Sequence, residues 1–100
     1  MATISSDILA SYAADAAREV DGVRGLVESA LHRRKGVRIA DDEGRVRVEL
    51  HLAVEWGASV PEVGREVQRR VGAYLERMAK VEPDSIDVVV DEIVRVEAAG

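Results

Sequence analysis

The sequence predicts an α+β fold: a two-layer sandwich in which two amphipathic helices pack on one face of a mixed, largely antiparallel sheet of about four strands. Three observations favour it. Residues 45–56 alternate between apolar and polar side chains, as a strand with one buried face does. Two other segments repeat apolar residues at helical spacing. The segments follow the order α-β-β-β-α-β, which allows both helices to cover one sheet.

A first helix is predicted to begin at Ser5 or Ser6, since either serine can cap it, with Asp7 in its first turn. From Ile8 onward, apolar residues recur four apart along a stripe of mostly small side chains. Gly22 can adopt the left-handed conformation that ends a helix. We therefore expect this helix to end near Asp21.

Three strands are predicted next, at residues 24–31, 37–40 and 45–56, with a turn at 41–44 between the last two. In the simplest hairpin register Ala40 lies opposite Arg45. The opposite sheet face is expected to meet water, and it would display Arg38, Arg47, Glu49, His51, Glu55, Asp87, Val89 and Asp91.

The same hairpin register makes specific pairs. Ile39 would meet Val46 on the buried face, and Arg38 would lie opposite Arg47 on the wet face. The arginine pair would be mildly unfavourable, because like charges repel across a sheet.

A second helix is predicted from a capping box, in which Ser59 caps the helix and Glu62 reaches back to the cap. Pro83 is predicted to mark the end of this helix. Gly64 and Gly72 are poor helix formers, so we expect another backbone to approach closely at both. The expected buried stripe consists of Val63, Val67, Val71, Leu75 and Met78.

The final strand is predicted at residues 85–96. Its alternation places Val89 and Ile93 on the face that should be wet. Two apolar residues there indicate either a central position in the sheet or a surface that binds a partner.

Composition limits the class of protein. A chain of 100 residues without repeats or a linker is expected to form a single domain, residues 1–100. The absence of cysteine favours a reducing cytoplasm. We expect neither a signal peptide nor direct membrane insertion, because the first residues carry no basic charge and no apolar run is long enough. The net charge of −5 argues against nucleic-acid binding.

No catalytic, cofactor or metal site is predicted. His51 shares a strand face with Glu49 and Glu55, but alternation alone explains this, and the two histidines show no metal-binding spacing. The acidic residues lie where side chains meet water, whereas general acid–base catalysis needs desolvated groups. No Gly-rich phosphate loop follows a strand. We expect a protein that is not an enzyme.

Two local features are candidate binding sites. The basic run His32, Arg33, Arg34 and Lys35 could contact RNA, an acidic protein or anionic lipid, and its alternative interpretation is a solvated loop. Trp56 could be an exposed anchor for a partner, and its alternative interpretation is the edge of the core.

Four segments, taken in order, resemble the bacterial alkaline shock protein family, which is also described as cell-envelope-related. They are residues 16–23 (AAREVDGV), 35–37 (KGV), 54–63 (VEWGASVPEV) and 67–71 (VQRRV). The resemblance implies a cytoplasmic protein linked to envelope homeostasis and general stress. It also implies self-association into a homo-oligomer and attachment to the membrane through a separate anchor protein. No catalytic residue comes with it.

The leading functional hypothesis is therefore a non-enzymatic scaffold that binds other proteins and itself, through an exposed sheet edge or the surface of Val89, Ile93 and Trp56. The alternative is a small RNA-binding module that uses the basic run. The acidic composition and the absence of a Gly-x-x-Gly clamp count against the alternative.

Overall fold

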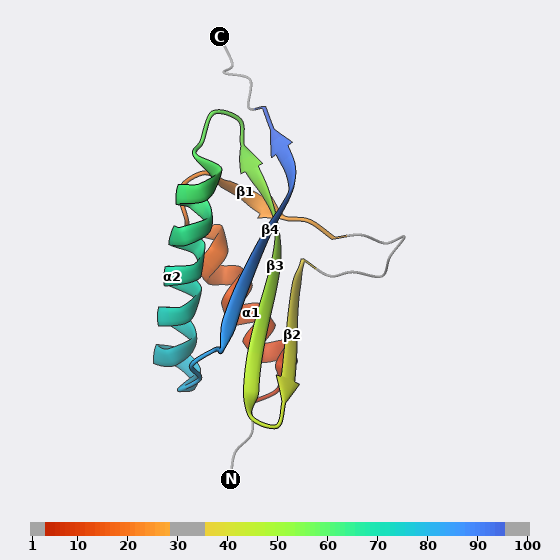
Figure 1. Cartoon of the computed structure of the whole chain (residues 1–100), viewed down its shortest axis with the longest axis vertical. Helices are drawn as coiled ribbons and strands as arrows, with labels where there is room; N and C mark the ends of the chain where they lie inside the picture. The colour runs from red at the N-terminus through yellow and green to blue at the C-terminus, as the bar shows by residue number, and fades with distance from the viewer. Residues whose placement is uncertain (1–3, 29–35, 96–100) are drawn as a thin grey trace.

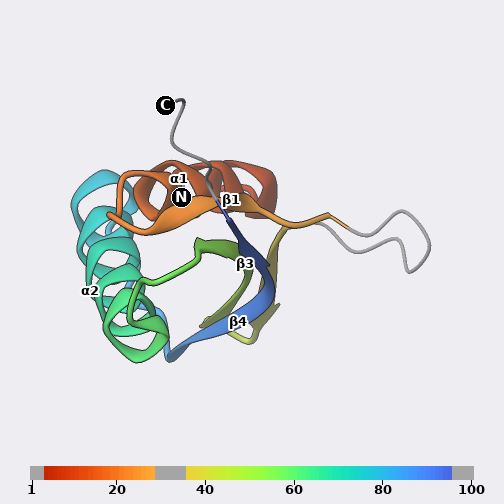
Figure 2. The ribbon, with the colours of Figure 1, turned by 90° about the horizontal axis from the view of Figure 1, so that it is seen from above.

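The computed structural model describes residues 4–28 and 36–95. Its elements follow the predicted order (Figure 1): α1 (Ser6–Arg18), β1 (Val23–Leu26), β2 (Val37–Asp42), β3 (Arg45–Glu55), α2 (Val60–Ala79) and β4 (Ser85–Val94). Both helices lie on the same face of the sheet (Figure 2). The α+β two-layer architecture is confirmed.

Strand β3 is the centre of the sheet. Strand β4 runs parallel to it over Arg47 to Glu55 and occupies one of its edges. Strands β2 and β1 pair antiparallel with successive parts of β3, at residues 45–50 and 52–54, and so share its other edge. The sheet is therefore mixed, with β4 joined to β3 through the crossover helix α2.

Helix α1 begins as predicted and ends early. The Ser5 hydroxyl accepts a hydrogen bond from the Ile8 amide at 3.2 Å, which caps the helix. The helix ends at Arg18, three residues before the predicted end. Gly22, at φ 93°, forms part of the turn into β1.

The β2–β3 hairpin is tighter than predicted. Asp42 pairs with Arg45, and the loop between them has only two residues, Glu43 and Gly44, with φ of 53° and 84°. Two left-handed residues match the twist of the flanking strands. The predicted pairing of Ala40 with Arg45 is wrong by two positions along β3.

This shift changes the partners but not the faces. Arg38 lies opposite Glu49, so the predicted pair of arginines does not form. Ile39 lies opposite Val48, which is fully buried. The hydrophobic pattern had specified the face correctly, because a shift of two residues preserves the alternation.

Strand β1 covers less than the predicted residues 24–31. It ends at Leu26, and residues 29–31 lie outside the described part of the chain. Strand β4 ends at Val94, one residue before Arg95, and the predicted last residue, 96, lies outside the described part of the chain.

Helix α2 starts at its predicted cap, where the Ser59 hydroxyl accepts from the Glu62 amide at 3.4 Å. Its buried stripe is Val63, Val67, Val71 and Leu75. Met78, predicted as buried, is 45% exposed. The predicted close approach of another backbone is found at neither glycine: an added Cβ at Gly72 would lie 3.4 Å from the side chain of Ile86, and at Gly64 nothing lies within 4 Å.

The core lies between the helices and one face of β3. Val48, Leu50, Leu52 and Val54 of the strand are fully buried. Small residues of α1, including Ala13 and Ala17, are also fully buried, which allows the helix to approach the sheet closely. Among the described residues the fully enclosed part of the core is aliphatic, as the composition indicates, and Tyr12 and Tyr74 pack partly buried against it.

Candidate interaction surface

Strand β4 is an edge strand. One of its edges pairs with β3, and in residues 4–28 and 36–95 no strand pairs with the other. The side chain of Gln68 on α2 donates to the Ile86 carbonyl at 2.8 Å. Apart from this cap, the edge presents backbone groups that a further strand could pair with.

A β-bulge interrupts β4 near its end. Val90 lies beside Leu52, but Glu92 lies beside Ala53, so Asp91 is the extra residue. Beyond the bulge the alternation of β4 is reversed relative to β3.

The bulge separates two residues that were predicted to share a surface. Val89 lies beside His51 on the face away from the helices, whereas Ile93 lies beside Val54, which belongs to the helix-facing row. Both are exposed, Val89 by 37% and Ile93 by 48%. The prediction that they share a face is wrong, because simple alternation does not hold through a bulge.

His51 is buried, contrary to the prediction of a wet face, and is only 4% exposed. Its Nδ1 lies 2.7 Å from the Asp91 Oδ2, and its Nε2 lies 2.8 Å from the Glu49 Oε2. An ionised carboxylate only accepts hydrogen bonds, so both bonds form together when both ring nitrogens carry protons. The bond to Asp91 links β3 to the bulge of β4, whereas Glu49 belongs to the same strand as His51.

This cluster differs from the constellation considered from the sequence. Glu49 forms a hydrogen bond with His51, as the alternation suggests. The second carboxylate bonded to His51 is that of Asp91 and not that of Glu55. Across the described residues, no group of three or more His, Cys, Asp or Glu side chains could hold a metal ion.

Trp56 lies just beyond β3 and is 63% exposed. Its amide donates to the Val94 carbonyl at 2.8 Å, and the Arg95 guanidinium lies 5.4 Å from the centre of its ring. The core-edge interpretation of Trp56 is wrong, and the side chain is accessible to a partner.

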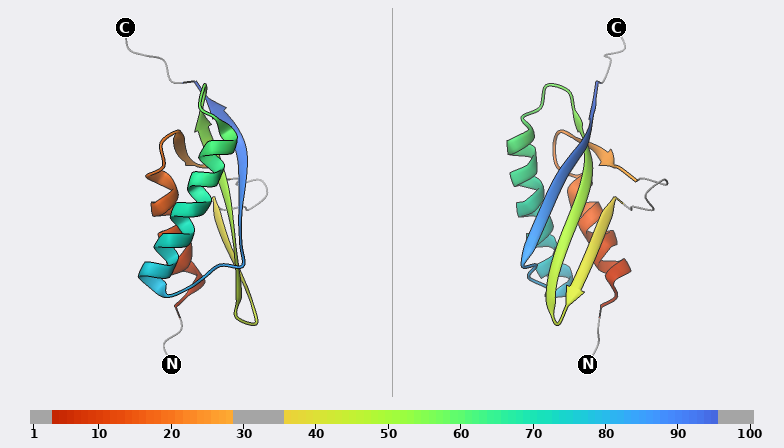
Figure 3. Two further views of the ribbon diagram at one scale, coloured as in Figure 1. Left: turned by 60° about the vertical axis from the view of Figure 1, so that its left-hand side comes forward. Right: turned by 45° about the vertical axis from the view of Figure 1, so that its right-hand side comes forward.

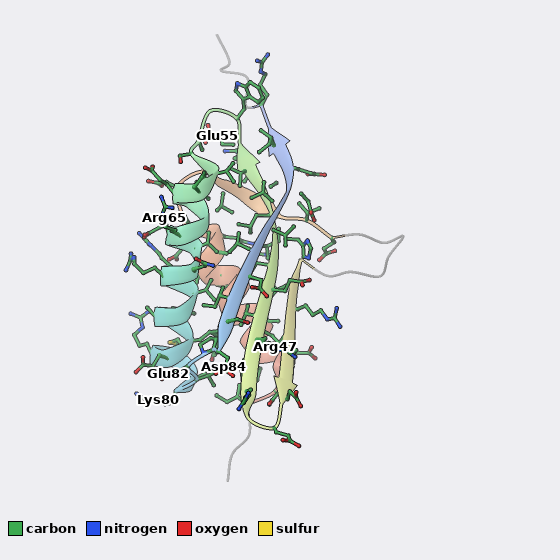
Figure 4. The ribbon with its side chains drawn as sticks, viewed as in Figure 1. Arg47, Glu55, Arg65, Lys80, Glu82 and Asp84 are labelled. Carbon is green, nitrogen blue, oxygen red and sulfur yellow. The ribbon has the colours of Figure 1, made fainter. Side chains whose placement is uncertain are left out.

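The charged residues of the outer sheet face form a shallow concavity. Arg38, Arg47, Glu49 and Asp87 are among the residues that line its volume of 220 Å³. Figure 4 shows Arg47 on β3 near the hairpin and Glu55 at the other end of the strand. The lining of this concavity therefore combines two arginines with two carboxylates.

The exposed face of α2 carries its own ion pairs. Side-chain hydrogen bonds from Arg69 and Arg70, at 2.6 and 2.9 Å, reach Glu66. They lower the pKa of Glu66 to about 2. The same hydrogen bond raises the pKa of Arg69.

The predicted basic patch of His32, Arg33, Arg34 and Lys35 lies outside the described residues. Among the helices that the structure describes, none is long and apolar enough to cross a membrane.

Comparison with known proteins identifies a family and a fold. The family model described as "ASP23 family, cell envelope-related function" matches residues 1–95. Protein Spy1614 of Streptococcus pyogenes serotype M6 is 26% identical in an alignment of 102 residues that covers 90% of this chain and 84% of that protein.

Among solved structures, MamM CTD 215-293 matches with a TM-score of 0.59 and 17% identity over 88% of this chain and 99% of that one. A cadmium form of a MamM CTD variant matches with a TM-score of 0.59 and 18% identity, covering 88% and 98% of the two chains. At this identity the likeness shows a shared fold alone.

Proposed function

Because the chain belongs to the ASP23 family of alkaline shock proteins, with its cell envelope-related function, we propose that it acts without catalysis, as a scaffold that binds proteins. It associates with copies of itself and is held at the membrane through an anchored envelope protein. It serves envelope homeostasis and the general stress response from the cytoplasm.

The observation that carries this proposal is the exposed strand β4. Its outer edge is unpaired within the described part of the chain, and it presents the apolar side chains of Val89 and Ile93 to solvent. An edge strand with exposed apolar residues is a site where another chain can add. Trp56, an aromatic residue of the kind that anchors interfaces, lies next to the end of β4.

The buried titratable cluster also favours a structural role over a catalytic one. His51 is bonded through both ring nitrogens to Glu49 and Asp91. A general acid or base needs a ring nitrogen that can exchange a proton with a substrate. Here both nitrogens are engaged by carboxylates of the protein itself, and the bond to Asp91 ties β3 to β4.

The experiment compares Val89→Lys with Met78→Lys by light scattering over a range of protein concentrations. Val89 and Met78 are 37% and 45% exposed, but Met78 belongs to the last turn of α2 and not to β4. Val89→Lys should reduce the average mass at each concentration, because it places a charge on the binding surface. Met78→Lys should match the original protein.

Equal association of the original protein and Val89→Lys would contradict the proposal that β4 is the binding surface. Circular dichroism of both variants shows whether each retains the fold, so that a lower mass is not confused with unfolding.

A further inference from the structure

We propose that copies of this chain associate head to tail, with the free edge of β4 in one copy paired antiparallel with the free edge of β2 in the next. The inference rests on the proposed function, since it names the two surfaces through which self-association occurs.

The two edges lie on opposite sides of β3. Figure 3 shows β2 and β4 flanking β3 in the same sheet. Each pairs with β3 through one edge only, and no described strand occupies the other edge of either. Because β2 runs antiparallel and β4 parallel to β3, a copy that repeats the same orientation sets the two edges antiparallel.

A row of three residues crosses the sheet from one edge to the other. Arg38 of β2 lies opposite Glu49, and Glu49 lies beside Asp87 of β4. Both end residues are exposed, and within residues 4–28 and 36–95 neither Arg38 nor Asp87 makes an ion pair. In a head-to-tail arrangement, Arg38 of the next copy lies opposite Asp87, so the interface pairs a cation with the acidic end of the row.

The same register also matches the apolar residues. On the helix-facing side it sets Val37 of the next copy opposite Val88, and Ile39 opposite Ile86. All four belong to the core or pack partly buried against it, so pairing extends burial that the edges leave incomplete. A shift of two residues would instead set the exposed Asp41 opposite Ile86. Within the paired strands, this register joins apolar residues on the helix-facing side and opposite charges on the outer side, and it sets Asp41 opposite Asp84 just before β4 begins.

Pairing of two β4 edges with each other is disfavoured. Strand β4 carries Asp87, Asp91 and Glu92 but no basic residue, so two copies would bring like charges together. The bulge at Asp91 also breaks the regular edge there. Unlike edges that join head to tail form an open chain, which lengthens with concentration, and not a closed dimer.

The test uses charge reversal at the two ends of the row. Arg38→Glu alone and Asp87→Arg alone each set like charges across every interface. Each should weaken association about tenfold or more, as like-charge contacts at interfaces do. Sedimentation velocity at matched concentrations measures the loss.

An equimolar mixture of the two variants should associate again. In such a mixture, alternating copies make either the original pair of Asp87 with Arg38 or the reversed pair of the two substituted residues, and both are attractive. If the copies associated through another surface, mixing the two variants would not change their association.

Two matched reversals serve as controls. Arg65→Glu lies on α2, and Glu82→Arg lies in the connection between α2 and β4 (Figure 4). Both residues are exposed and lie outside the two paired edges. Both variants should associate like the original protein, and circular dichroism verifies that all four are folded.

The outcomes separate this inference from the proposed function. If the original protein associates and the reversals at positions 38 and 87 associate equally well, edge pairing is overturned while self-association stands. A protein that is monomeric at every concentration overturns both. Loss with each variant and recovery in the mixture supports the head-to-tail chain.

Discussion

His51 and Asp91 lie 40 positions apart in the sequence, yet the histidine Nδ1 and the aspartate Oδ2 are 2.7 Å apart. Asp91 is the extra residue of the β4 bulge, and the bond ties that bulge to the central strand. The shape of the exposed end of β4 therefore depends on a side chain of β3.

Replacing His51 tests this link. His51→Ala should lower the free energy of unfolding by about 2 to 3 kcal/mol, because it removes two hydrogen bonds between a buried side chain and carboxylates. Urea unfolding measures the change. Arg47→Ala, on the same strand and exposed, is the matched control and should change stability by less than about 0.5 kcal/mol. Similar losses for the two variants would show that the cluster adds no stability.

The two glycines of α2 should respond differently to alanine. Gly64→Ala should raise the free energy of unfolding by about 1 kcal/mol, because alanine favours the helix and nothing lies within 4 Å of the added Cβ. Gly72→Ala should gain less, since its Cβ would meet the Ile86 side chain at 3.4 Å. Thermal unfolding compares them, and a larger gain at Gly72 would contradict the packing described.

The hairpin turn stores a small amount of backbone strain at Glu43, where φ is 53°. Glu43→Asn should stabilise the protein by about 0.5 to 1 kcal/mol, because asparagine tolerates the left-handed conformation and Asn-Gly favours this turn. Glu43→Gln removes the same charge without that tolerance and is the control. Equal effects in chemical denaturation would assign the gain to charge instead of conformation.

Glu66 gives a defined pH dependence. Hydrogen bonds from Arg69 and Arg70 lower its pKa from the ordinary value of 4.5 to about 2 in the folded protein. A lowered folded pKa means that its stabilising contribution is present above pH 4.5 and is lost as pH falls toward 2. Thermal unfolding of Glu66→Gln should therefore show a weaker pH dependence in this window than the original protein. Identical slopes, or an NMR titration of Glu66 near its ordinary value, would contradict the ion pairs.

Local signals predicted much of the fold. The caps at Ser5 and Ser59 identified where both helices begin, and strict alternation identified the buried face of β3. These features depend on residues close in sequence, so the chain itself displays them.

The exposed surface was predicted less well. The bulge at Asp91 could not be predicted from the sequence of β4 alone, because it is defined by how β4 pairs with β3. The burial of His51 likewise depends on Asp91. Val89 and Ile93 were correctly identified as exposed apolar residues, but only the register of the strands shows that they face opposite ways.

The most direct measurement is the mass of the original protein by light scattering across a wide range of concentration at moderate salt. We predict a mass that rises steadily with concentration and shows no plateau at a dimer, because unlike edges leave a free end at each step. A constant monomer mass across the whole range would contradict the central claim that this protein works by self-association through its sheet edges.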